Sequence, residues 1–272
     1  MTDARPTREI QFKGVSFRLS DEPGPARFVL GLRKSGSSLL NQMLKFIAER
    51  NGVNYVDLPG TFFNAGVPLD AWHNDDLSAI LRPGNMYIGF RNCPPAFASA
   101  PLFARSRRVF MFRDPRDALV SQYFSDAYSH SLPEGDSEQA QAARRHFIAK
   151  RERTLATDIN DFVLKEARSM DEAFMGYAEV LRSPLTLKLR YEEHVFQKKR
   201  LIAKIAEHLS LPMPKAATEA LLAQVDVVPT AEDKNRFIRS VTPGDHRRKL
   251  RPDTIEKLDE VLQRSLKLYD YH

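Results

Sequence analysis

The strongest constraint on the fold lies in residues 27–50, where an apolar run, a glycine-containing loop and an amphipathic pattern follow one another. Residues 27–32 read Arg-Phe-Val-Leu-Gly-Leu, which predicts a buried strand. Residues 37–50 carry apolar side chains at helical spacing. Between them Gly31 and Gly36 have the spacing G-x-x-x-x-G. Such a loop exposes backbone N–H groups beside a positive helix N-terminus, and it therefore predicts an anion site.

The rest of the chain alternates short apolar runs with amphipathic stretches. We expect further strands at 86–90, 108–112 and 185–190, and helices at 115–128, 198–209 and 252–268, with a charge-rich and mostly helical stretch over 138–182. This alternation predicts an α/β fold, a central parallel sheet flanked by helices on both faces. We expect a polar N-terminal lead-in over 1–25 and one domain over 26–272, with a mostly helical segment at about 134–182.

Composition excludes several classes of protein. The chain has 272 residues, a net charge of +6 and a single cysteine, Cys93, so an internal disulfide framework and a zinc cluster of cysteines are excluded. No segment approaches the roughly 20 apolar residues that span a bilayer, and no signal-peptide core is visible, so we expect a cytoplasmic protein. The basic balance suits an anionic partner or solubility alone. The chain contains no lysine-rich run of the kind that indicates a nucleic-acid partner, so we expect none. The oligomeric state is left open.

The first anion loop differs from that of nucleotide kinases. The residue after Gly36 is Ser37, where an ATP- or GTP-binding loop has lysine, and the cation is Lys34, inside the loop. A P-loop-type nucleotide kinase or NTPase needs that missing lysine. It remains an alternative, as does a simple strand–turn–helix whose serine caps the helix.

Two more segments combine cations with turn or cap residues. Arg113 follows the run 108–112, and Ser121 lies eight residues later, about two helical turns on, so the pair could grip a phosphate. Residues 239–249 form a cation-rich loop that contains glycine and could close over an anion. The alternatives are a surface ion pair and a solvated basic loop.

Together these segments resemble the sulfotransferases that use 3′-phosphoadenosine-5′-phosphosulfate (PAPS). The segment 34–38, Lys-Ser-Gly-Ser-Ser, resembles the family's 5′-phosphosulfate loop, and Arg113 to Ser121 resembles its 3′-phosphate motif. Tyr191, in Leu-Arg-Tyr-Glu-Glu, resembles the tyrosine that contacts the nucleotide. Residues 239–245 resemble its late Arg-Lys-Gly-x-x-Gly-Asp loop.

The resemblance implies a P-loop NTPase-like fold and transfer of a sulfuryl group to an acceptor hydroxyl or amine. Lys34 would hold the bridging and leaving oxygens, and no metal would be required. Arg113, Ser121 and Arg239 would hold the 3′-phosphate. The implied donor-binding residues are Arg33, Ser35, Gly36, Ser37, Ser38, Arg113, Ser121, Tyr191, Arg239 and Ser240.

The departures from the family concern the adenine and the acceptor. Leu39 stands where a tryptophan often stacks on adenine, His246 replaces the tryptophan of the late loop, and Asn92 stands near the usual catalytic histidine. Asp57 is our first candidate for the general base, with His130 and His73 as alternatives.

The acceptor, a small molecule or a carbohydrate, stays unidentified, and a non-catalytic anion-binding module remains an alternative. Aromatic residues could line an apolar acceptor site or could be ordinary core. They are Phe62, Phe63, Trp72, Phe90, Phe97, Tyr123, Phe124 and Tyr128.

Overall fold

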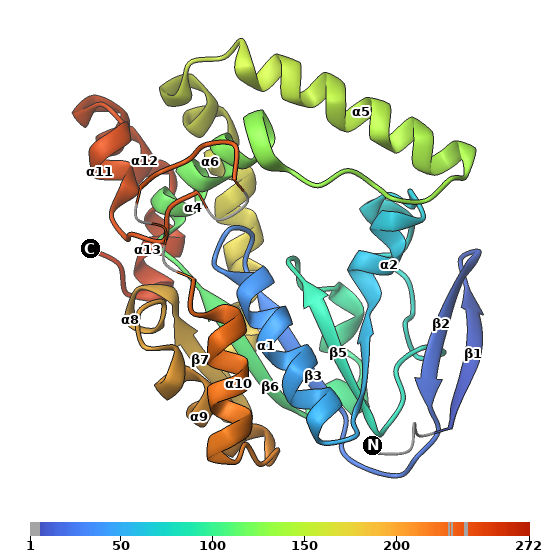
Figure 1. Ribbon diagram of the computed structural model, residues 1–272. Helices are drawn as coiled ribbons and strands as arrows, with labels where there is room; N and C mark the ends of the chain where they lie inside the picture. Colours follow the sequence, from blue (N-terminus) through green and yellow to red (C-terminus); the bar gives the residue numbers. More distant parts are fainter. Residues whose placement is uncertain (1–5, 228, 230, 237–238) are drawn as a thin grey trace.

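The computed structural model describes residues 6–227, 229, 231–236 and 239–272 (Figure 1). Its centre is a five-stranded sheet in the order β4-β5-β3-β6-β7, with every neighbouring pair parallel. The strands are β3 (Arg27–Gly31), β4 (Asn54–Asp57), β5 (Asn85–Phe90), β6 (Arg107–Phe112) and β7 (Thr186–Arg190). The predicted α/β class is confirmed, and β4 is one strand more than the four that the apolar runs indicated.

Helices cover both faces of the sheet. One face packs against a hydrophobic cluster shared with α1 (Ser37–Arg50), α9 (Lys198–Leu209) and α10 (Lys215–Val225). The opposite face packs against α4 (Pro115–Phe124) and α6 (Ile159–Met175), together with the C-terminal helices. Because helices cover both faces of the sheet, its central strands are mostly buried; β3 and β5 are buried along their whole length.

The N-terminal segment corrects one expectation. Where a loose polar lead-in was predicted over 1–25, residues 7–20 form an antiparallel hairpin of β1 (Thr7–Phe12) and β2 (Val15–Ser20). Val15, Phe17 and Leu19 are buried, and the Phe17 ring meets the Phe62 ring edge-on at 5.1 Å. The period-2 alternation of β2 is a strand signal that the surrounding polar residues obscure.

Two predicted helices are interrupted. The helix expected over 115–128 ends as α4 at Phe124 and continues as a π-helical turn, η3 (Ser125–Ser129), in which the His130 N–H donates to the Ser125 carbonyl at 2.7 Å. The helix expected over 252–268 is two helices, α12 (Pro252–Val261) and α13 (Gln263–Tyr269).

The remaining helices are short, apart from α5 (Glu138–Leu155), which lies across one end of the molecule (Figure 1). None of the helices in the described residues is long and apolar enough to cross a membrane. The short elements are α2 (Leu58–Asn64), η1 (Leu69–Ala71), η2 (Pro95–Ala98), α3 (Pro101–Ala104), α7 (Ala178–Arg182), α8 (Tyr191–His194) and α11 (Asp245–Lys249).

Candidate active site

The first anion loop joins the end of β3 to the start of α1 in a tight left-handed turn. Lys34 has φ 62° and Gly36 has φ 85°, both in the region that L side chains rarely adopt. A Cβ atom at Gly36 would lie 2.9 Å from Cδ2 of Tyr191, so glycine is required for space as well as for conformation. The loop is therefore built against the ring of Tyr191, one of the predicted donor-binding residues.

Lys34 lies near several other positively charged side chains. It is half-buried, and within the described residues its ammonium group has neither an ion pair nor a hydrogen bond. Burial, followed by the charge of Arg91, lowers the pKa of Lys34 to about 8; Arg113 and Arg239 act in the same sense and Asp126 opposes them. Cations gathered in this way favour a bound anion.

The neighbouring residues also leave polar atoms without partners. Nε of Arg33, Oγ of Ser35 and Nε of Arg113 are buried and lack a hydrogen bond within the described residues. Buried polar groups are normally paired, so three such atoms around one loop fit a site that an anion completes. Ser37 and Ser38 open α1 beside them.

Arg113 stands at the end of β6. Its Nη2 is 3.2 Å from Oδ2 of Asp117, and its guanidinium lies 4.6 Å from the centre of the Tyr191 ring. Asp114 caps α4 by accepting from the Arg116 N–H at 2.9 Å, which sets the start of the helix. Ser121 lies two turns further along α4, half-buried, with no hydrogen bond to its hydroxyl within the described residues.

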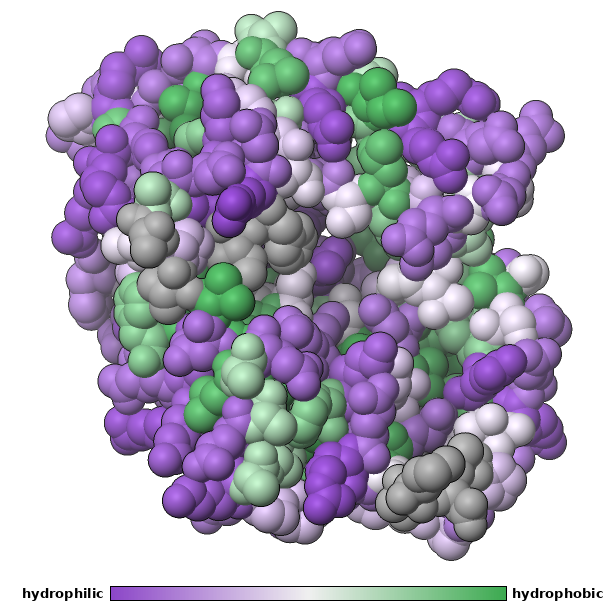
Figure 2. Space-filling model, in the orientation of Figure 1, coloured by the Kyte–Doolittle hydropathy of each residue, from purple (hydrophilic) through white to green (hydrophobic). Residues whose placement is uncertain are grey.

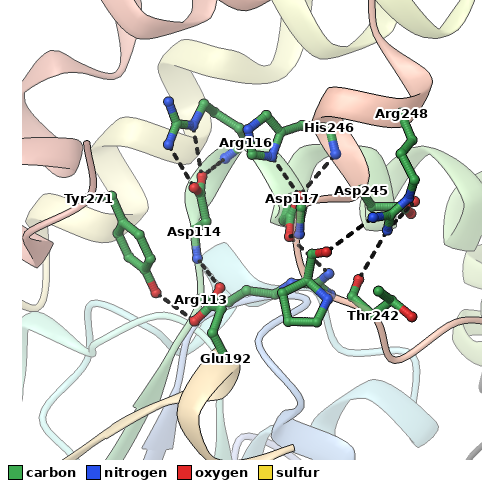
Figure 3. A network of polar contacts seen from close by, with 12 residues as sticks. Arg113, Asp114, Arg116, Asp117, Glu192, Thr242, Asp245, His246, Arg248 and Tyr271 are labelled. Atoms are coloured by element: carbon green, nitrogen blue, oxygen red, sulfur yellow. Dashed lines mark hydrogen bonds and ion pairs between the residues drawn. The ribbon is translucent and has the colours of Figure 1, made fainter.

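Asp117 ties the late loop to α4 (Figure 3). Its carboxylate accepts from the Gly244 N–H at 2.7 Å, from the His246 N–H at 2.9 Å and from Nδ1 of His246 at 2.6 Å. Burial alone would raise the pKa of Asp117, but the hydrogen bonds from His246 and the charge of Arg113 outweigh it and hold that pKa well below its usual range. His246, which stands in place of the family's tryptophan, is thus a binding partner of Asp117.

Arg239, the first arginine of the late loop, is paired with carboxylates. Arg239 forms ion pairs with Glu232 and Asp245, and its guanidinium lies 4.2 Å from the centre of the Phe124 ring. Oγ of Ser240 accepts a long bond, 3.4 Å, from the Thr242 N–H.

The four predicted segments therefore meet around Tyr191. The tyrosine ring touches the first loop and lies beneath Arg113, while its hydroxyl donates to the Val241 carbonyl of the late loop at 3.2 Å. Segments more than 150 residues apart in sequence form one cation-rich end of the sheet.

Asp57 ends β4 and lies in a cradle formed by two glycines. Its Oδ1 accepts from the Gly60 N–H at 2.8 Å and caps α2. A Cβ at Gly60 would lie 2.4 Å from Oδ2, and one at Gly89 would lie 2.0 Å from Oδ1. Burial raises the pKa of Asp57, with the Gly60 N–H and Arg91 opposing. Glycine at both positions makes room for a carboxylate that accepts a proton more readily than an exposed one.

The two histidines proposed as alternatives differ in their surroundings. His130 follows η3, and burial together with the charges of Lys34 and Arg91 lowers its pKa. Because the charge of Lys34 acts on it, His130 lies near the first loop. His73 meets the Trp72 ring edge-on at 5.9 Å, and burial lowers its pKa as well. None of the described contacts of His73 involves the anion loops.

Sequence reasoning missed two charged groups of the site, Arg91 and Asp126. Arg91 directly follows β5, as Lys34 and Arg113 follow their strands, so the same strand-end signal could have found it. Asp126 is 7% exposed and lies within the π-turn, and nothing in the sequence marks that turn. Of the proposed aromatic residues, Phe62, Trp72, Phe90 and Phe97 are core.

A parallel sheet whose strand ends carry a phosphate-type loop and convergent cations is the arrangement of an α/β protein that binds an anionic ligand. Residues 93–270, well over half of the chain, match the model of the sulfotransferase domain, and the chain belongs to that family. It is an enzyme of the sulfotransferase class. The matched stretch contains Arg113, Tyr191 and Arg239 but not the first loop.

A solved sulfotransferase structure shows the same fold. The mouse sulfotransferase SULT7A1 complexed with PAP is 14% identical and superposes with a TM-score of 0.58, covering 98% of this chain and 99% of that chain. The sulfotransferase STF9 from Mycobacterium avium is 13% identical, with a TM-score of 0.49 over 93% of this chain and 79% of that one. No curated protein matches the sequence.

Proposed function

We propose that this protein transfers a sulfuryl group from PAPS to a hydroxyl or amine of a small-molecule or carbohydrate acceptor. The observation that carries the proposal is Lys34, whose ammonium group has no ion pair or hydrogen bond within the described residues. Burial and neighbouring cations lower the pKa of Lys34 to about 8, and its φ of 62° lies in the left-handed region. An anion with several charges, such as a phosphosulfate, would relieve this repulsion.

The donor would be held at both ends. Ser37, Ser38 and the N–H groups of the first loop suit the 5′-phosphate, because they open helix α1. Arg113 and Ser121 suit the 3′-phosphate. Arg239 would join them by exchanging its carboxylate partners for phosphate oxygens. Cations at both phosphates would make a metal unnecessary.

Transfer would be in-line. The acceptor oxygen or nitrogen bonds to sulfur as the bond from sulfur to the 5′-phosphate oxygen breaks, and the electron pair stays on that leaving oxygen. Lys34 stabilises the charge that develops there. Asp57 takes the acceptor proton, for which its raised pKa and glycine cradle suit it.

Asp57→Asn tests the base, because asparagine keeps an oxygen to cap α2. We expect turnover to fall about 10²-fold or more while donor binding stays within twofold. Asp136→Asn, which makes the same change at an exposed aspartate, is the matched control. Unchanged turnover in Asp57→Asn would remove Asp57 from this role.

The donor assignment competes with an ATP-dependent kinase, and calorimetric titration separates them. Without metal, we expect 3′-phosphoadenosine-5′-phosphate (PAP) to bind with micromolar affinity and more tightly than ADP or ATP–magnesium. Ser121→Ala should weaken PAP while leaving ADP unchanged, because ADP lacks the 3′-phosphate; Arg105→Ala, an exposed arginine, is the control. Preference for ATP–magnesium, or no nucleotide binding, overturns the proposal.

A further inference from the structure

Figure 2 shows a hollow, which we call the cleft, with hydrophobic side chains beside it in the region where Figure 1 places α2 and α5. The side of the cleft away from the late loop is formed by α2, the π-turn η3 and α5. Three aromatic rings from these elements form a cluster, which we call the aromatic wall: Phe63, His130 and Phe147.

The rings of the aromatic wall contact one another without being core residues. Phe63 of α2 meets Phe147 of α5 edge-on at 5.4 Å, and His130 stacks on Phe147 at 5.0 Å with an interplanar angle of 13°. All three are half-buried. Nδ1 of His130 lies 2.7 Å from the Ser131 carbonyl, so Nδ1 carries the proton and donates it. When His130 is neutral, none of the three rings of the wall carries a charge.

The aromatic wall lies within reach of the reacting groups. His130 senses the charge of Lys34, and Phe63 is six residues after Asp57, which caps the same helix. At 1.5 Å per residue this separation is about 9 Å along the helix, roughly the length of a two-ring compound that carries a hydroxyl group. An acceptor whose hydroxyl meets Asp57 could therefore rest its apolar part on the wall.

One ion pair connects the π-turn η3 to α5 close to Phe147. Oδ2 of Asp126, whose side chain is 6% exposed, lies 2.7 Å from Nζ of Lys150, one turn after Phe147 on α5. The next residue, Arg151, donates from Nη2 to the His130 carbonyl at 3.0 Å. Apart from Ala140, the apolar side chains of α5 are half-buried or exposed, and Ile148 is 42% exposed. A helix with so little buried apolar surface depends on its polar contacts for its position.

We propose that the Asp126–Lys150 ion pair fixes α5 across the cleft so that Phe147 completes, with Phe63 and His130, a wall for the apolar part of the acceptor. Asp126 is then a positioning residue for acceptor binding, and the π-turn is what brings it inward to α5. The inference rests on the proposed function and adds to it an acceptor that carries an apolar or aromatic body.

The test measures acceptor-side binding separately from donor binding. The enzyme is saturated with PAP and titrated calorimetrically with 2-naphthol as an apolar hydroxyl probe, and hydrogen exchange of α5 is followed by mass spectrometry. Asp126→Asn and Lys150→Met should each weaken 2-naphthol at least fivefold and speed exchange in residues 138–155. Arg145→Met, which removes an exposed charge from the same helix, should change neither.

The sign of the effect on PAP distinguishes positioning from general damage. Removing the Asp126 carboxylate takes a negative charge from the neighbourhood of Lys34, so PAP should bind Asp126→Asn as tightly as wild type or more tightly. Asp126→Glu should recover part of the 2-naphthol affinity. Unchanged 2-naphthol affinity and α5 exchange in Asp126→Asn overturn the inference, as does failure of the wild-type PAP complex to bind 2-naphthol. Failure of wild type to bind PAP overturns the proposed function instead.

Discussion

The two sides of the cleft are stabilised differently. The side assigned to the donor is fixed by buried charges: Asp117, 1% exposed, holds Arg113, His246 and the backbone of the late loop. The side assigned to the acceptor consists of half-buried rings on α2, on α5 and just after η3, and the Asp126–Lys150 ion pair joins η3 to α5. The comparison indicates that the donor side is held rigidly by buried charges, whereas the acceptor side is a surface that is easier to displace.

The largest effect should come from the centre of the rigid side. Asp117→Asn leaves Arg113 buried without its anionic partner, so we expect a loss of about 3–5 kcal/mol in the free energy of unfolding. Urea denaturation measures it, with exposed Asp136→Asn as a control that should stay within about 0.5 kcal/mol.

The pH dependence of that loss checks its cause. The folded-state pKa of Asp117 lies below its unfolded value of about 3.9, so the carboxylate stabilises the fold above that pH and this contribution is lost as the pH falls. The difference between wild type and Asp117→Asn should shrink below about pH 4. A difference that is the same at pH 3 and pH 7 would contradict a charge-based role.

The next effect concerns chemistry and leaves the fold in place. Lys34→Met should lower kcat by about 10²–10³-fold, because it removes a preorganised cation from the leaving oxygen. Lys45→Met, on the exposed face of α1, is the matched control and should retain wild-type turnover. Near-normal turnover in Lys34→Met would mean that another group stabilises the leaving oxygen.

The contrast between the two sides also explains what could be predicted from the sequence. An anion grip needs glycine at left-handed φ, cations at strand ends and a serine at helical spacing, and these are local signals; Gly36, Arg113 and Ser121 were found in this way. The strands β3, β5, β6 and β7 were found because each carries apolar residues within a short run.

Other features depend on tertiary packing and leave no local pattern. The inward position of Asp126 comes from a π-turn that replaces the end of an expected helix. Phe147 was not considered because nothing in the α5 sequence shows which of its faces meets α2. The hairpin over 7–20 was missed because its apolar alternation spans only Val15, Phe17 and Leu19.

A smaller effect separates the role of Lys34 from that of the fixed arginines. Its pKa of about 8 means that free Lys34 loses its proton as the pH rises through 8, whereas a bound anion favours the protonated form. PAP affinity should therefore fall above pH 8, by up to about tenfold per pH unit. Calorimetry at pH 8.5 in two buffers of different ionisation enthalpy should show proton uptake. Lys34→Met should abolish that uptake, and persistence in this variant would assign it to another group.

The smallest expected effect concerns adenine, the part of the donor for which the rigid side offers no assigned contact. Leu39 is half-buried against the core cluster under α1, at the position where relatives often carry tryptophan. Stacking of a base on an aromatic ring is worth about 1–3 kcal/mol. Because a larger ring must also displace part of the Leu39 packing, we expect Leu39→Trp to tighten PAP by only about fivefold. ADP should gain by the same factor, and inorganic pyrophosphate, which has no base, should gain nothing. A gain with pyrophosphate would show that the substitution acts through the loop, and no gain with either nucleotide would place the adenine away from α1.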